Sequence, residues 1–82
     1  MEKDTIIVKF EYMGKVIDLD IPSSITAQEF IIAVNEAYGL GIDTTDIKSC
    51  HLQAENPIAL VKGNKTLSDY GFRNGTKVYF VR

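Results

Sequence analysis

The sequence predicts an α+β fold in which one helix covers one face of a four- or five-stranded mixed sheet. Two stretches near the N-terminus alternate apolar and polar residues, as strands with one buried face do. A capping sequence then begins one amphipathic segment, and short apolar runs bounded by turn residues follow it. A single helix covers only one face of a sheet, so the other face must meet solvent or a partner.

The first two predicted strands span residues 5–11 and 15–21, with a turn at Met13-Gly14 between them. Their alternation gives each strand one apolar face, formed by Ile6, Val8 and Phe10 and by Ile17, Leu19 and Ile21. The opposite faces carry Ile7, Lys9 and Glu11 and Val16, Asp18 and Asp20. The two strands therefore form a hairpin that buries one face.

The helix is predicted to begin after Thr26 and to end near Tyr38. Thr26 and Glu29 have the spacing of a capping box, in which each side chain satisfies a free backbone N–H of the first turn. Gly39 is the expected stop, because glycine adopts a left-handed conformation without a Cβ clash. The predicted buried stripe is Phe30, Val34 and Ala37 or Tyr38, with Ile31 beside it.

The second half of the chain predicts three short strands. They are expected at residues 48–53, 58–61 and 77–81, with turns at 55–57, 62–65 and 74–75 between them. Residues 68–70 are expected to form one 3₁₀-type turn. Together with the hairpin and the helix, the predicted order is β-β-α-β-β-turn-β.

Composition indicates one domain over residues 1–82, expected in the cytoplasm. Its 82 residues include a single cysteine, so no internal disulfide can form. The first four residues lead directly into the first strand rather than into a signal peptide, and no apolar run approaches the roughly 20 residues that span a bilayer. The net charge is −2 without a Lys/Arg cluster, which argues against nucleic acid and anionic lipid as partners.

No catalytic, cofactor or metal site is expected. Cys50 and His51 are the only cysteine and histidine, and neighbouring residues in a strand point to opposite faces, so they cannot form a dyad. Cys50 is expected in the core and His51 on the open face. Asp18 and Asp20 would need a cleft to act as paired catalytic carboxylates, and charges that protect a sheet edge are the simpler interpretation.

The segment Thr66-Leu67-Ser68-Asp69-Tyr70 resembles ubiquitin, which carries the same five residues before its last strand. The resemblance extends to the hairpin, to Pro22-Ser23 and to the capped helix. It implies the β-grasp fold, with the first and last strands parallel at the sheet centre. It also implies that the Tyr70 hydroxyl ties the preceding loop to the backbone.

Within that superfamily the chain resembles the YukD/EsaB family, small bacterial ubiquitin-like proteins of type VII secretion. The residues that carry this resemblance are Leu52, Glu55-Asn56-Pro57, residues 62–67, Tyr70-Gly71-Phe72 and Asn74-Gly75. The resemblance implies a non-enzymatic cytoplasmic adaptor or regulator. Its expected partners are membrane components of the secretion machine or its ATPase.

The end of the sequence bears on whether the protein is conjugated. Ubiquitin and the sulfur carriers act through a flexible tail that ends in Gly-Gly, whereas Val81-Arg82 is bulky and charged. We therefore expect noncovalent binding. A modifier or sulfur carrier seen without its tail, and a ubiquitin-like module of an unrelated complex, are the alternatives.

The uncovered sheet face is the predicted protein-binding surface. If Val78 and Phe80 point to the helix, Tyr79 and Val81 point away, and Ile7 does so on the neighbouring strand. The predicted binding residues are Ile7, His51, Tyr79 and Val81, expected as one open cluster with His51 or Gln53 at its margin. In the ubiquitin resemblance, Val81 falls on an apolar residue of the partner-binding patch.

Overall fold

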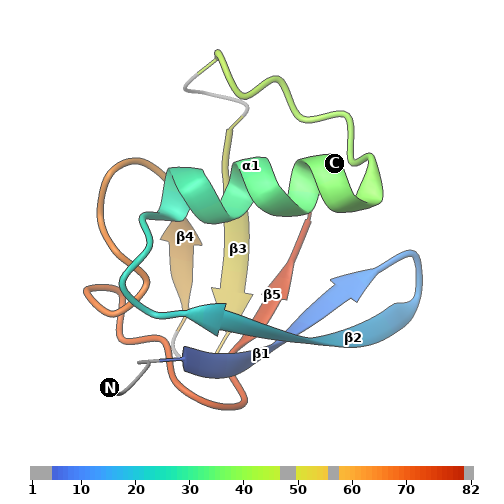
Figure 1. The fold of residues 1–82 in the computed structure, drawn as a ribbon. Coiled ribbons are helices and arrows are strands. Elements are labelled where there is room, and N and C mark those ends of the chain that lie inside the picture. The colour runs from blue at the N-terminus through green and yellow to red at the C-terminus, as the bar shows by residue number, and fades with distance from the viewer. Residues whose placement is uncertain (1–4, 47–49, 56–57, 81–82) are drawn as a thin grey trace.

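A computed structural model describes residues 5–46, 50–55 and 58–80 and contains one sheet with one helix across it (Figure 1). The elements are β1 (Thr5–Tyr12), β2 (Lys15–Pro22), α1 (Ala27–Tyr38), β3 (Leu52–Glu55), β4 (Ala59–Val61) and β5 (Lys77–Tyr79). The strand order is β2-β1-β5-β3-β4, with β1 and β5 parallel and the other pairs antiparallel. This mixed α+β sheet is the β-grasp arrangement that the ubiquitin resemblance implies.

The hairpin and the helix form where the sequence predicts them. Val8 and Phe10 of β1 are buried, while Ile7 on the other face is exposed. The Glu29 backbone N–H donates to Thr26 Oγ1 at 3.1 Å, and the Thr26 N–H donates to Glu29 Oε1 at 2.8 Å, which completes the capping box. Gly39 ends α1 with φ of 62°, the left-handed conformation that glycine tolerates best.

The core lies between α1 and the sheet. Its buried apolar side chains come from α1, from every strand except β2, and from the loops; the largest are Phe10, Phe30, Ile31, Leu52, Leu67, Val8, Val61 and Val78. Cys50 is also buried, as predicted, and so is Phe72. Tyr38 rather than Ala37 continues the buried stripe of α1, because Ala37 is exposed and Tyr38 packs against the core.

The three strand ranges predicted in the second half of the chain differ from the structure at their ends. The third strand begins at Leu52 rather than at residue 48, because the Cys50 N–H donates to the Asp46 carbonyl at 2.9 Å and is therefore committed to a turn. The fourth begins at Ala59, since Ile58 lies in a turn. The last strand ends at Tyr79. Residues 47–49, 56–57 and 81–82, on which parts of these predictions fall, lie outside the described residues.

The loop before β5 is held by its tyrosine, as the resemblance implies. The Tyr70 hydroxyl donates to the Lys62 carbonyl at 2.8 Å and accepts from the Lys62 N–H at 3.2 Å. Two N–H groups, those of Tyr70 and Gly71, donate to the carbonyls three residues earlier, which gives the predicted 3₁₀-type turn. Within the described ranges, no helix has the length and apolar character needed to cross a bilayer.

Candidate functional site

One row of side chains crosses all five strands on the sheet face opposite α1. The strand registers pair Val16 with Glu11, Glu11 with Tyr79, Tyr79 with Gln53, and Gln53 with Leu60. Directly opposed residues share a face, so these five side chains form a continuous line, the cross-strand row. Four strand spacings of about 4.8 Å make this row roughly 19 Å long.

The row is apolar at both ends and aromatic near its middle. Val16 is 57% exposed and Leu60 is 45% exposed, while Tyr79 is half-buried between Glu11 and Gln53. Large apolar side chains at that exposure on a regular sheet are available for contact without any change of fold. The cross-strand row is therefore the described part of the open face that is best suited to bind another protein.

A row of charged side chains, with two lysines between two acidic residues, lies beside it. The registers align Asp18, Lys9, Lys77 and Glu55 across four strands, and we refer to these residues as the charged row. Lys9 Nζ lies 3.3 Å from an Asp18 carboxylate oxygen, and Lys77 Nζ lies 3.0 Å from Glu11 Oε1. The hydrogen bond with Glu11 and then its negative charge raise the pKa of Lys77, with a smaller contribution from Glu55. Lys77 is therefore a fixed positive charge beside Tyr79.

The structure does not form the expected cluster of Ile7 with Tyr79. Tyr79 faces Glu11, which is four residues beyond Ile7 along β1, so about 13 Å separates the two positions. The charged row lies between them. The reason is the turn before β5: the Ile7 N–H donates to Asn74 Oδ1 and the Gly75 N–H donates to the Ile7 carbonyl, both at 2.8 Å. That turn occupies the position beside Ile7 where a longer β5 would have continued.

The other predicted binding residues have different outcomes. Tyr79 lies on the open face as expected, and Ile7 is 40% exposed on the same face beyond the charged row. His51 is half-buried in the irregular segment before β3, and Val81 lies outside the described residues. Val16 and Leu60 were not predicted as site residues. Alternation places Val16 on this face, but only the strand registers bring it into line with Tyr79.

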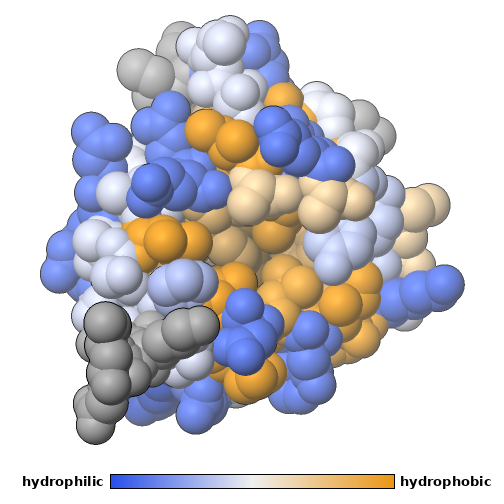
Figure 2. Space-filling model, viewed as in Figure 1, coloured by the Kyte–Doolittle hydropathy of each residue, from blue (hydrophilic) through white to orange (hydrophobic). Residues whose placement is uncertain are grey.

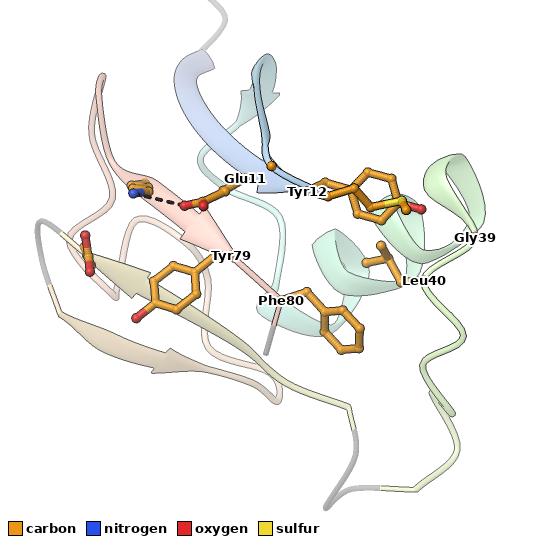
Figure 3. A pocket seen from close by; sticks show the side chains of 10 residues that line it. Glu11, Tyr12, Gly39, Leu40, Tyr79 and Phe80 are labelled. Carbon is orange, nitrogen blue, oxygen red and sulfur yellow. Dashed lines mark ion pairs between the residues drawn. The ribbon is translucent and has the colours of Figure 1, made fainter. Parts of the chain in front are cut away.

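A hollow of about 600 Å³ adjoins the middle of the cross-strand row, at Glu11 and Tyr79 (Figure 3). Glu11 and Tyr79 line it from the open face, and Tyr12, Leu40 and Phe80 line it from the side of the helix. The Tyr12 hydroxyl donates to the Tyr38 carbonyl at 2.9 Å, which holds one wall against the end of α1. The hollow has room for an apolar or aromatic side chain from a partner that lies on the row.

The described residues offer little for covalent chemistry. Cys50 is buried, and burial raises the pKa of its thiol, with a smaller contribution from the negative charge of Asp43. The thiolate, which is the nucleophilic form, is thus disfavoured at neutral pH. Over residues 5–46, 50–55 and 58–80, no three His, Cys, Asp or Glu side chains gather into a group that could hold a metal.

Several solved ubiquitin-like domains have the same fold. The C-terminal ubiquitin-like domain of mouse tubulin-specific chaperone e is similar with a TM-score of 0.70 and 13% identity, over 96% of this chain and 87% of that one. The ubiquitin-like domain of Plasmodium falciparum Dsk2 gives 0.62 and 19%, over 92% and 96%. That of the Mycobacterium tuberculosis type VII secretion system protein ECCD1 gives 0.59 and 17%, over 95% and 98%. At these identities the similarity shows the fold alone.

The sequence itself identifies the family. No curated protein matches the chain. The family model described as "WXG100 protein secretion system (Wss), protein YukD" matches residues 5–79, which includes every strand and the helix. The chain therefore belongs to the YukD family of ubiquitin-like proteins of type VII secretion.

Proposed function

We propose that this protein is a noncovalent, non-enzymatic adaptor or regulatory subunit of a type VII secretion machine, and that it binds its partner through the cross-strand row. The observation that carries the proposal is the continuous line from Val16 to Leu60 on the face that α1 leaves uncovered. Membership of the YukD family supplies the secretion context.

The physical argument for binding is the free energy of removing apolar surface from water. Each Å² of apolar surface buried contributes about 25 cal/mol, so covering Val16, Leu60 and the ring of Tyr79 provides a favourable centre for an interface. A typical interface covers about 800 Å² on each partner, which extends beyond the row and includes the charged row. Lys9 and Lys77 between two acidic side chains would then select partners of complementary charge.

The proposed partners are a membrane component of the machine or its ATPase, with the protein acting in the cytoplasm. ECCD1 of Mycobacterium tuberculosis is a type VII secretion protein with a ubiquitin-like domain. A machine whose components carry such domains is a suitable place for a small binding module of the same fold. Nucleic acid is not among the proposed partners, because the net charge is negative.

A secretion assay with matched surface variants tests the role of the row. Tyr79→Ala combined with Leu60→Asp removes the aromatic ring near the middle of the row and places an unpaired charge at one of its ends, inside the proposed contact. We expect this variant to abolish secretion while the protein remains folded. Ile7→Asp makes a similar change on the same face beyond the charged row and should leave secretion near normal. If Ile7→Asp abolished secretion and the Tyr79/Leu60 variant did not, the contact would lie at the Ile7 end of the open face instead. Contributions of His51 and Val81 remain predictions that single alanine variants test.

Conjugation is tested separately. Denaturing immunoblots of host lysate should show one band near the monomer mass of 9.2 kDa. A ladder of larger species that survives detergent and reductant would contradict the noncovalent part of the proposal, and would favour a modifier instead. Full secretion by the Tyr79/Leu60 variant would contradict the assignment of the binding face.

A further inference from the structure

The long edge of the sheet is a second candidate contact surface. β2 has eight residues and, among the described strands, pairs only with β1, so it forms one edge of the five-stranded sheet. An edge strand presents the outward N–H and C=O groups of every second residue as a template for another strand. The opposite edge, β4, has three residues and offers a much shorter template.

Beside this edge, apolar side chains line a hollow between β2 and α1 (Figure 2). Ile17, Leu19 and Ile21 face the helix but remain only partly buried. On α1, Ala33 and Ala37 are exposed. At 100° per residue they lie on the side of the helix opposite Gln28 and Asn35. Gln28 and Asn35 form hydrogen bonds to the loops that follow β4 and precede β3, so Ala33 and Ala37 lie on the side away from those loops. Small side chains on that flank leave the inner face of β2 accessible.

The outer face of β2 is acidic. Asp18 and Asp20 alternate with the apolar residues, and both are exposed. Lys9 contacts Asp18, whereas Asp20 has no ion pair among the described residues. On the other side of the hollow, α1 carries Glu29 and Glu36 and no basic residue. The edge therefore presents an apolar side and an acidic side at the spacing of a strand.

From this pattern we propose that β2 receives an added strand from a partner protein in which apolar residues alternate with Lys or Arg. Residues opposed across a strand pair share a face, so the apolar side chains would enter the hollow and the basic ones would lie beside Asp18 and Asp20. A second copy of this chain is disfavoured, because it would bring two acidic edges together. The site goes beyond the cross-strand row, since it uses the edge and the helix side of β2.

A peptide probe tests this directly. The probe is a fluorescent synthetic peptide of about eight residues, one per position of β2, in which Ile or Val alternates with Lys or Arg. One control peptide has the same composition in two blocks, and another has Glu in place of the basic residues. Fluorescence anisotropy should detect binding of the alternating peptide only, and that binding should weaken as salt is raised.

Two charge variants and amide exchange locate the contact. Asp20→Lys should weaken binding about fivefold or more, because an attraction becomes a repulsion. Asp69→Lys makes the same charge change in an exposed turn and should leave the affinity unchanged. In the complex, amides of β2 that exchange quickly in the free protein should become protected.

Three results would overturn the inference: equal affinity for the alternating and block peptides, protection that leaves β2 unchanged, or a dimer of the free protein with β2 already protected. Each of them leaves the proposal for the cross-strand row untouched, because that proposal is tested by secretion with Tyr79 and Leu60 variants.

Discussion

Neighbouring residues of β5 should respond very differently to the same substitution. Val78 is fully buried, paired with Phe10 on one side and Ala54 on the other. Val78→Ala removes two methyl groups from the centre of the core, which costs about 1.6 kcal/mol in transfer free energy, and the cavity left behind adds to this. We expect a loss of about 2–3 kcal/mol in the free energy of unfolding.

Tyr79→Ala should cost less although it removes more atoms. Tyr79 faces away from α1, and its stabilising contacts are the cross-strand pairs with Glu11 and Gln53, each worth about 0.5 kcal/mol, near the middle of the range for such pairs. The expected loss is about 1 kcal/mol or less. This difference matters for function, because a residue of a binding face should be replaceable without unfolding the domain.

Thermal unfolding followed by circular dichroism distinguishes the two variants. In a domain of this size, each kcal/mol lowers Tm by about 4–8 °C, so Val78→Ala should melt roughly 8–24 °C below the wild type and Tyr79→Ala within about 8 °C of it. Equal losses in the two variants would refute the division of the sheet into a buried face and an open face.

Three further predictions concern the elements that hold the fold in place. Tyr70→Phe removes both hydrogen bonds to Lys62 and should lower the free energy of unfolding by about 1 kcal/mol, measured by urea titration. An unchanged midpoint of urea unfolding would show that these hydrogen bonds do not stabilise the loop. Thr26→Ala breaks the capping box with Glu29 and should cost about 0.5–2 kcal/mol in the same titration, whereas a neutral effect would show that α1 needs no cap. The side chain and the backbone N–H of Thr45 donate hydrogen bonds to Asp43, and these bonds lower the pKa of Asp43 below its ordinary value of 3.8. The stabilisation from these bonds is therefore present above pH 3.8 and is lost as the pH falls through the pKa of the folded state. NMR titration of this carboxyl should give a midpoint below 3.8, and a midpoint at or above 3.8 would contradict the hydrogen bonds.

Local signals in the sequence were sufficient to predict the hairpin and the helix. Alternation assigned Val8 and Phe10 to the core and Ile7 to the open face, and the spacing of Thr26 and Glu29 located the start of α1. Each of these features depends on residues close together in the chain. The β-grasp order followed from the resemblance that the Thr66–Tyr70 segment carries.

The alignment of side chains on the open face could not be predicted, because it depends on register between distant strands. Alternation gives the face on which Ile7 and Tyr79 lie but not their separation along the sheet. That separation is set by hydrogen bonds of Ile7 to the turn at residues 74–75, which place Tyr79 opposite Glu11. The start of β3 was missed for a similar reason, since the Asp46 carbonyl holds the Cys50 N–H in a turn.

Photo-crosslinking in the host tests the central claim most directly. A photo-reactive phenylalanine analogue replaces Val16 or Leu60, the two exposed ends of the cross-strand row, or Asp69 in a turn away from it as the control. We predict ultraviolet-dependent crosslinks from positions 16 and 60 to the same component of the type VII secretion machine, and none to it from position 69. Crosslinks to that component from position 69 alone, or none from either end of the row in a secreting cell, would contradict the account.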